Sequence, residues 1–395
     1  MGGAVRDGWL VRVAAVGFPV VGVVGGGQLA RMMAPPAIAL GITLEVLARD
    51  PQDSAALVVP GTTVGVEDDL EALRAFAARC DVLTFDHEHV PTGHLRTLVA
   101  EGVVVRPGPD ALEHAQDKLV MRQKLTALGI ACPRWRAVTT TDELAAFGAE
   151  VGWPVVLKTP RGGYDGKGVR LVEQPGDADD WLAGADAADA PLLAEERVRF
   201  TRELAVLVAR SPHGQAAVWP VVETIQVDGV CREVVAPAAI HQDHALAAQQ
   251  AALRIAEGLG VTGVMAVEMF DTEAGVLVNE LAMRPHNSGH WTIEGSRTSQ
   301  FEQHLRAVLD LPLGDTRMTA PQVVMANVLG GDFPDMYDGY LHCLAHDRGV
   351  RIHMYGKEVR PGRKVGHVTA LGSDAEDVRE RARHAAAFLR GDIHG

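Results

Sequence analysis

The chain has 395 residues, of which 47% are hydrophobic and 22% are charged, and its formal net charge is −14. This length predicts two or three domains, since one small hydrophobic core does not organise so long a chain. So acidic a composition argues against nucleic acid and membrane as partners, because both require basic surface, and no apolar run reaches the ~20 residues of a membrane span.

The first seventeen residues are apolar and contain two arginines, so a signal peptide has to be considered. Asp7 and Gly8 interrupt the run, and the strand after it leads directly into a glycine turn that a folded domain needs. We therefore interpret residues 1–17 as a disordered extension. The four cysteines show neither a CxxC motif nor zinc-like spacing, which predicts ordinary thiols in a reducing cytoplasm.

The front of the chain alternates buried strands with helices. Strands are predicted at Val20–Val24, Thr43–Ala48 and Val82–Phe85, with helices at 28–40 and 70–78 between them. This alternation predicts a parallel, doubly wound sheet. A further helix is predicted at 112–128, closed by Gly129.

A glycine turn follows the first strand. Residues 25–30 fit the dinucleotide pattern G-x-G-x-x-A, and Asp50, some twenty residues later, is placed to bind a ribose. An NAD-dependent oxidoreductase is therefore one hypothesis. The pattern has low specificity, however, because other ligand-binding α/β domains use the same turn to bring the backbone close to a phosphate.

A second glycine-rich loop lies between two strands instead of before a helix. Lys158 lies in the strand predicted at 155–159, the loop spans 161–168, and the next strand is Val169–Val172. The pattern predicts a hairpin whose tip acts as a mobile flap and closes on a polyphosphate through backbone N–H groups and lysine. A flexible exposed hairpin without a ligand is the alternative.

The remaining elements alternate less regularly. A helix with a solvated loop is predicted at 177–189, and short strands and turns are predicted from Pro321 onward. The other predicted elements are strands at 192–194, 204–209, 218–220, 264–270 and 276–280, and helices at 244–260 and 374–389.

Two glutamates lie in the hairpin predicted over residues 264–280. If Phe270 pairs with Val276, then Glu268 and Glu280 lie diagonally on one face, about 7–8 Å apart between Cα atoms. Carboxylates at that distance repel unless a cation bridges them, and Mg²⁺ prefers such oxygen ligands, with Asn279 and phosphate oxygens completing the shell. The alternative is two exposed charges at strand ends.

A polar, histidine-rich run follows at residues 281–292. A small planar anion beside a nucleotide phosphate requires such hydrogen-bonding groups, and Arg284 offers a bidentate fork. The cluster Asp86-His87-Glu88-His89 follows a predicted parallel strand, where ligand hydroxyls bind more naturally than zinc. For each histidine alone, a structural hydrogen bond remains an alternative.

Motifs along residues 20–371 carry a resemblance to a known family. The motifs are Gly25-Gly26-Gly27-Gln28-Leu29-Ala30-Arg31-Met32, Gln116-Asp117-Lys118, Leu157-Lys158-Thr159, Gly162-Gly163-Tyr164-Asp165-Gly166-Lys167-Gly168, Asn279-Glu280-Leu281-Ala282, His286-Asn287-Ser288-Gly289-His290-Trp291-Thr292, Tyr355-Gly356-Lys357 and Arg360-Pro361-Gly362-Arg363-Lys364-Val365-Gly366-His367-Val368. Together they resemble the N5-carboxyaminoimidazole ribonucleotide synthetases, which are ATP-grasp enzymes. The run 286–292 is specific to this family, whereas ATP-grasp enzymes share the glycine loops.

The resemblance implies the architecture and the partners. It implies a Rossmann-like domain at 18–115, an ATP-grasp fold at 116–318 with its flap lobe at about 135–210, and a small β-rich domain at 319–395. The implied enzyme is a cytoplasmic homodimer that binds ATP, Mg²⁺ or Mn²⁺, bicarbonate and aminoimidazole ribonucleotide.

The resemblance also implies roles for individual residues. The implied metal ligands are Glu268 and Glu280, completed by Asn279. The implied ATP-binding residues are Lys118, Lys158, Gly163, Tyr164, Asp165, Gly166, Lys167, Gly168, Val169, Glu195, Glu196, Arg197, Val198, Glu203, Gln226, Asn279 and Glu280. The implied bicarbonate and substrate-amine site comprises Tyr164, Asp165, Lys167, Arg284, His286 and Asn287. The implied ribonucleotide site comprises Gln28, Leu29, Glu88, Lys357, Arg363 and Lys364.

The chain departs from the family pattern in three places. Gln226 stands where a histidine is usual, Met283 replaces a proline, and Asp86-His87 replaces an acidic-aromatic pair. These changes affect nucleotide selectivity and leave every implied metal ligand in place. The resemblance implies that ATP and bicarbonate give carboxyphosphate, which carboxylates the substrate amine. Rival hypotheses are a formate-dependent glycinamide ribonucleotide transformylase, a biotin carboxylase and a non-catalytic nucleotide sensor.

Overall fold

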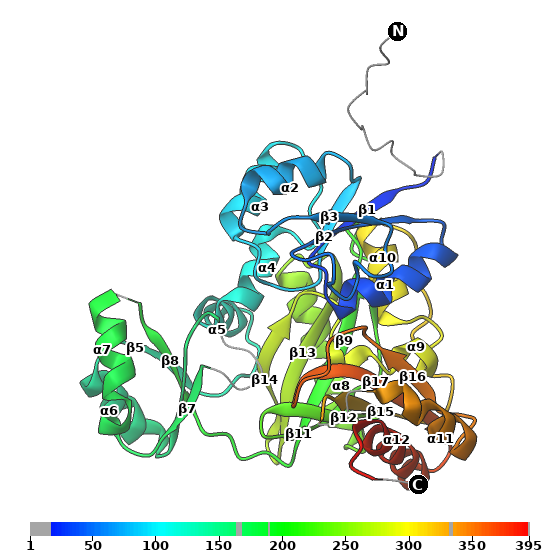
Figure 1. The fold of residues 1–395 in the computed structure, drawn as a ribbon. Coiled ribbons are helices and arrows are strands. Elements are labelled where there is room, and N and C mark those ends of the chain that lie inside the picture. Colours follow the sequence, from blue (N-terminus) through cyan, green and yellow to red (C-terminus); the bar gives the residue numbers. More distant parts are fainter. Residues whose placement is uncertain (1–16, 163–167, 189, 332–334, 394–395) are drawn as a thin grey trace.

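The computed structural model describes residues 17–162, 168–188, 190–331 and 335–393 (Figure 1). The predicted extension, apart from Gly17, and the loop tip at 163–167 lie outside the described residues. The described chain forms three β-sheets: a parallel sheet near the N-terminus, a small sheet in a protruding lobe, and a large sheet that reaches the C-terminal part (Figure 1).

The first sheet is wholly parallel, with strand order β3-β2-β1-β4. Its five-residue strand β1 is buried along its whole length, as expected of a strand covered on both faces. The predicted doubly wound sheet is confirmed, although β3 and α3 were missed. The elements are β1 (Val20–Val24), α1 (Gln28–Ala39), β2 (Thr43–Ala48), β3 (Gly61–Val64), α2 (Leu70–Ala77), β4 (Val82–Phe85) and α3 (Thr92–Ala100).

The single helix predicted at 112–128 is wrong: two helices occupy the segment, α4 (Pro109–Gln116) and α5 (Lys118–Ala127). They meet at Asp117, which is extended and whose carboxylate accepts hydrogen bonds from the backbone N–H groups of Leu119 and Val120. An aspartate in this N-cap position starts a new helix. As a result, Lys118 lies in the first turn of α5.

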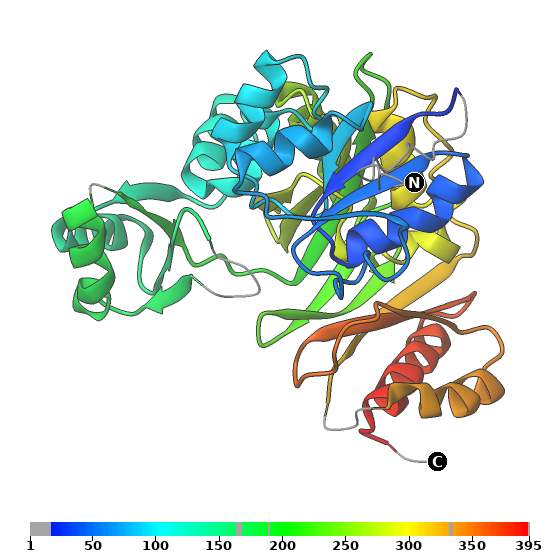
Figure 2. The same cartoon turned by 45° about the horizontal axis from the view of Figure 1, so that its top comes forward.

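A lobe with its own four-stranded antiparallel sheet, of order β5-β8-β6-β7, protrudes from the molecule (Figures 1 and 2). The hairpin predicted around the glycine-rich loop is confirmed at its strands, with Lys158 of β6 paired to Val169 of β7. The elements are β5 (Trp135–Val138), α6 (Thr141–Val151), β6 (Val155–Lys158), β7 (Val169–Val172), η1 (Pro175–Ala178), α7 (Asp179–Ala188) and β8 (Leu192–Glu196).

A nine-stranded sheet runs from the central part into the C-terminal part, in the order β14-β13-β9-β11-β12-β15-β17-β16 with β10 beside β9. The strands are β9 (Arg202–Arg210), β10 (Ala216–Val218), β11 (Val222–Val227), β12 (Val230–Ala236), β13 (Gly263–Thr272), β14 (Gly275–Ala282), β15 (Gln322–Leu329), β16 (Arg351–Met354) and β17 (Lys364–Gly372). The sheet crosses the predicted boundary at 318/319 through the pairing of β12 with β15.

Among the described residues, the helical segments that accompany this sheet are α8 (Gln242–Gly258), η2 (Asn287–Gly289), α9 (Thr292–Gly295), α10 (Gln300–Val308), η3 (Met336–Asp338), α11 (Gly339–His346) and α12 (Ala375–Arg390). Residues of α8 share one buried core with β9 and β13, and residues of α12 share another with β15 and β17. The strand predicted at 218–220 lies earlier, in β10, because Pro220 has no N–H group to donate to a ladder. Strands β11 and β12 were missed.

The predicted pairing of Phe270 with Val276 is wrong. Phe270 pairs with Leu277, because β13 extends to Thr272 and the loop contains only residues 273–274. The register then shifts between Glu268 and Met269, which makes Asn279 the extra residue of a β-bulge. The shift places the two glutamates directly opposite each other instead of diagonally, because Glu268 pairs with Glu280.

Candidate active site

A cavity of about 1070 Å³ lies where the three parts of the chain meet. Of the predicted site residues that the structure describes, only Gly168 is absent from its lining. The cavity therefore collects Gln28, Leu29, Glu88, Lys118, Lys158, Val169, Glu195, Glu196, Arg197, Val198, Glu203, Gln226, Glu268, Asn279, Glu280, Arg284, His286, Asn287, Lys357, Arg363 and Lys364. The roles assigned to them stay predictions.

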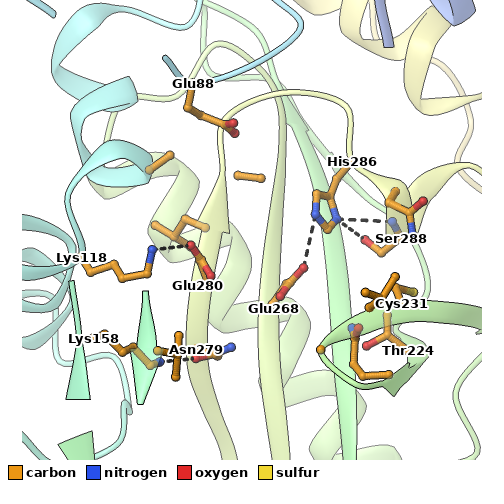
Figure 3. Close-up of a pocket in the computed structure, with 18 of the residues that line it drawn as sticks. Glu88, Lys118, Lys158, Thr224, Cys231, Glu268, Asn279, Glu280, His286 and Ser288 are labelled. Atoms are coloured by element: carbon orange, nitrogen blue, oxygen red, sulfur yellow. Dashed lines mark hydrogen bonds and ion pairs between the residues drawn. The ribbon is translucent and has the colours of Figure 1, made fainter. Parts of the chain in front are cut away.

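The cross-strand glutamates lie at the centre of this cavity (Figure 3). The pKa of Glu268 is raised to about 7. Burial is the largest cause, and the neighbouring carboxylates of Glu280 and Glu203 add to it. Lys118 Nζ lies 2.9 Å from Glu280 Oε1. Two opposed carboxylates and an adjacent amide oxygen form an oxygen donor set that fits Mg²⁺.

The second lysine of the cavity, Lys158, is held by Glu195, which the buried Arg122 holds in turn. Glu195 lies between two cations: Arg122 Nε is 2.5 Å from its Oε1, and Lys158 Nζ is 2.6 Å from its Oε2. Burial alone would raise the pKa of Glu195, but the two positive charges outweigh it and lower the pKa. Lys158 also donates to Asn279 Oδ1 at 3.2 Å (Figure 3). The ammonium is therefore held beside the acidic pair.

The polar run after β14 lies on the other side of the glutamates. His286 Nε2 is 3.3 Å from Glu268 Oε1 (Figure 3). The backbone N–H of Ser288 donates to His286 Nδ1, so the neutral ring carries its proton on Nε2 and presents it to the carboxylate. Burial lowers the pKa of His286 to about 3, with Arg284 and Lys364 adding to the effect, which keeps the ring neutral.

Arg284 connects the run to the first domain, because its Nε donates to Glu88 Oε2 at 2.7 Å. Lys357 Nζ donates in turn to Gln28 Oε1 at the start of α1. Burial lowers the pKa of Lys357, and the nearby charge of Arg363 lowers it further. This end of the cavity thus gathers cations that suit an anionic ligand.

Three domain families match the chain in order. A ribonucleotide synthetase preATP-grasp domain matches residues 19–116, an ATP-grasp domain 123–301, and a phosphoribosylaminoimidazole carboxylase C-terminal domain 323–381. The N5-carboxyaminoimidazole ribonucleotide synthase of Mycobacterium tuberculosis is 57% identical over 376 residues, which cover 94% of this chain and 88% of that protein. This chain belongs to the N5-carboxyaminoimidazole ribonucleotide synthase family.

Other members of the synthase family match equally completely. The Corynebacterium ammoniagenes synthase is 46% identical, covering 94% of this chain and 92% of that protein. A crystal structure of the Aspergillus clavatus synthase in complex with ADP and 5-aminoimidazole ribonucleotide has a TM-score of 0.84 and 33% identity, covering 95% of this chain and 99% of that chain. The glycine turn at 25–30 lies within the preATP-grasp match, so we drop the oxidoreductase hypothesis.

Sequence reasoning missed several residues of this synthase site. Arg122 is fully buried and also donates to the backbone oxygen of Asn279 at 2.7 Å. Its signal was present in the sequence, since Leu119, Arg122 and Leu125 follow the i, i+3 spacing of a buried helix face. The stacked rings of Phe200 and Phe270, 4.7 Å apart between centroids, line the cavity and had no such signal.

No helix in the described part of the chain combines the length and the apolar character that a bilayer crossing requires. In the described part of the chain no cysteine forms a disulfide; Cys231 and Cys343 are buried, and Cys80 and Cys132 are half-buried.

Proposed function

We propose that this synthase uses ATP and bicarbonate to carboxylate 5-aminoimidazole ribonucleotide at its amine, giving N5-carboxyaminoimidazole ribonucleotide, ADP and phosphate in purine biosynthesis. The names of the relatives support this activity. The observation that carries it is a single cavity with opposed glutamates and two lysines at its centre and a separate cationic end around Lys357.

The ATP phosphates bind where the two lysines converge. Lys158 is pre-positioned by Glu195, so that its ammonium is ordered before the nucleotide arrives. Glu268, Glu280 and the side chain of Asn279 would hold Mg²⁺, which when bound supplies positive charge to offset the charge on the transferring phosphoryl group. Lys118 would then exchange its contact with Glu280 for a phosphate oxygen.

Adenosine binds beside β8 and the segment that follows it. Glu196 already accepts from the backbone N–H and the side chain of Arg134 at 2.8 Å, and its own N–H donates to the Arg134 carbonyl oxygen at 2.9 Å. Neither its carboxylate nor its N–H is therefore left for the base, which we assign to the segment after β8. Glu203 is half-buried, partial burial raises the pKa of its carboxyl, and we assign it to the ribose hydroxyls. Gln226, in place of the usual histidine, lines the same region and influences nucleotide selectivity.

In the reaction, a bicarbonate oxygen attacks the γ-phosphorus and the bond to the β,γ-bridging oxygen breaks, so that ADP leaves and carboxyphosphate forms. The substrate amine then attacks the carboxyl carbon and expels phosphate. Arg284 orients the carboxyl oxygens through its guanidinium, and neutral His286 donates a hydrogen bond from Nε2. The flap predicted at 161–168, whose tip lies outside the described residues, would exclude water, which would hydrolyse carboxyphosphate.

The activity is tested with an acceptor and carboxyl-donor panel. Phosphate release from ATP should require bicarbonate together with 5-aminoimidazole ribonucleotide, and ¹³C-bicarbonate should label the product. Formate with glycinamide ribonucleotide, or bicarbonate with biotin, should give background release. Turnover with either of these pairs, and none with 5-aminoimidazole ribonucleotide, would replace the proposal by the corresponding ATP-grasp reaction.

The proposed contact of Arg284 with the carboxyl oxygens of bicarbonate is tested by Arg284→Lys, which keeps the positive charge but loses the planar guanidinium fork. We expect bicarbonate-dependent phosphate release to fall on the order of 10- to 100-fold while ATP affinity changes little. Because Arg284 also donates to Glu88, Glu88→Gln serves as a matched variant that weakens this contact and retains the fork. Loss of ATP binding in Arg284→Lys would assign the residue to the nucleotide site.

We further propose a cytoplasmic homodimer with domains at 18–115, 116–318 and 319–395, as the family resemblance implies. Sedimentation velocity of the purified chain should give a concentration-independent dimer. A monomer at micromolar concentration would refute the dimer.

A further inference from the structure

A cluster of three histidines lies on the C-terminal helices, outside the cavity. His342 and His346 lie one turn apart on α11, and His384 projects from α12, which packs against α11 (Figure 1). None of the residues that line the cavity comes from these two helices. The carboxylation chemistry therefore does not account for the cluster.

The imidazole nitrogens lie close together, on rings that are partly stacked. One ring nitrogen from each histidine lies within 4.8 Å of the other two, and His342 Nε2 is 3.1 Å from His384 Nε2. Two nitrogens bound to one tetrahedral ion at 2.0–2.1 Å would lie about 3.3–3.4 Å apart. The observed pair is therefore already close to the spacing of two ligands, and a rotamer change of the exposed His346 closes the remaining gap.

The surroundings orient the rings and keep them available. His342 stacks face to face on Phe388, with 3.7 Å between centroids and 4° between planes, which fixes the direction of its nitrogen. A neutral imidazole is the form that binds metal.

We infer that His342, His346 and His384 form a binding site for a divalent transition-metal ion of the Zn²⁺ class. Two histidines at i, i+4 on one helix and a third from a neighbouring helix give an all-nitrogen donor set that suits Zn²⁺, Ni²⁺ or Cu²⁺ and not Mg²⁺. A fourth position remains for water or for Glu380, which lies one turn before His384 on α12. The ion would join α11 to α12 and stabilise the C-terminal part of the fold.

The test uses the full-length chain without a histidine tag, stripped of metal and kept in excess MgCl₂ so that oxygen sites are occupied. Zn²⁺ binding is measured by competition with a chromophoric chelator for the wild type, for His346→Asn, and for His213→Asn, an exposed histidine outside the cluster. We expect one equivalent to bind in the wild type and in His213→Asn, and at least about 10-fold weaker binding in His346→Asn.

Two further readouts separate a metal site from stacked rings. Zn²⁺ should raise the melting temperature of the wild type and of His213→Asn but not of His346→Asn, and bound Co²⁺ should show the intense visible bands of four-coordination only in the first two. Carboxylation by His346→Asn in Mg²⁺ should match the wild type, because the cluster lies outside the cavity. Equal Zn²⁺ affinity in His346→Asn and wild type, or no stoichiometric binding in either, would overturn the inference.

Discussion

Two β-hairpins contribute to the same cavity and are built in opposite ways. The hairpin β13–β14 belongs to the nine-stranded sheet, turns in two residues, and carries Glu268 and Glu280 on a bulged register. The hairpin β6–β7 belongs to the small lobe sheet and joins its strands through the long connection 159–168. The comparison teaches that a short turn within a large sheet fixes two carboxylates opposite each other, whereas the second hairpin fixes Lys158 at the end of a strand, before a long connection.

The largest expected effect is at the fixed carboxylates. Glu280→Gln keeps the shape of the side chain but removes a charge from the acidic pair, so we expect carboxylation to fall on the order of 100-fold or more with folding intact. Steady-state phosphate release at saturating substrates measures the loss. Glu273→Gln, in the exposed loop of the same hairpin, is the matched control and should retain full activity. Near-normal turnover of Glu280→Gln at moderate Mg²⁺ would remove it from the metal site.

The second effect is at the other hairpin, on the lysine that ends β6. Lys158→Met removes a charge-assisted contact worth about 1.5–3 kcal/mol, so ATP binding should weaken about 10- to 100-fold. Glu195 keeps its contact with Arg122, so the fold should hold. Calorimetric titration with an ATP analogue measures the change, and Lys124→Met on α5, outside the cavity lining, is the control. Unchanged affinity would move the phosphates away from β6.

The third prediction concerns the pH dependence of the carboxylate hairpin in the metal-free protein. Since the pKa of Glu268 is raised to about 7 from 4.5, the native state binds its proton more tightly than the unfolded state between these pH values. Stability contributed by this group therefore falls as pH rises from 4.5 to 7. Relative to wild type, Glu268→Gln should gain about 1–3 kcal/mol in free energy of unfolding by pH 8, and little at pH 4.

Denaturant titrations at pH 4, 6 and 8 measure that difference. Glu273→Gln should show no such trend. A pH-independent difference between Glu268→Gln and wild type would contradict the raised pKa of Glu268, which burial and then the neighbouring carboxylates produce.

The smallest effects distinguish the two connections themselves. Gly275 has φ +126° as the first residue of β14, directly after the two-residue turn, and Gly162 has φ +78° near the start of the long connection. An added Cβ meets no atom within 4 Å at either glycine. Gly275→Ala should lower the free energy of unfolding by about 1–3 kcal/mol. Gly162→Ala should cost less than about 1 kcal/mol, because the long connection has more dihedral angles over which to spread the strain. Equal losses would show that connection length does not matter here.

The sequence predicted these two hairpins unequally well. It placed both strands of the hairpin β6–β7, because an apolar run ends at Lys158 and the next one begins directly after Gly168. It placed Glu268 and Glu280 on one hairpin but not in register, since a bulge depends on pairing across the sheet and has no signal in a single strand. The same limit hid β11, β12 and the sheet that joins the central and C-terminal parts, because strand order is set by tertiary packing.

The sequence named residues of the cavity lining where a motif and a suitable side chain coincide, as at Lys158 and Arg284. It missed residues that act through another residue. Arg122 is such a case: it contacts the cavity only by way of Glu195 and Asn279. The break between α4 and α5 at Asp117 was missed for a related reason. An aspartate inside a helical pattern is compatible with one long helix, and tertiary packing decides whether it caps a second helix instead.

A crystal structure of the full chain with a non-hydrolysable ATP analogue and Mn²⁺, located by its anomalous signal, tests the central claim most directly. We predict metal between the carboxylates of Glu268 and Glu280 at about 2.0–2.3 Å, with Asn279 and phosphate oxygens completing the shell and Lys158 on a phosphate. Phosphates bound away from Lys158, or a metal bound by neither glutamate, would contradict the account.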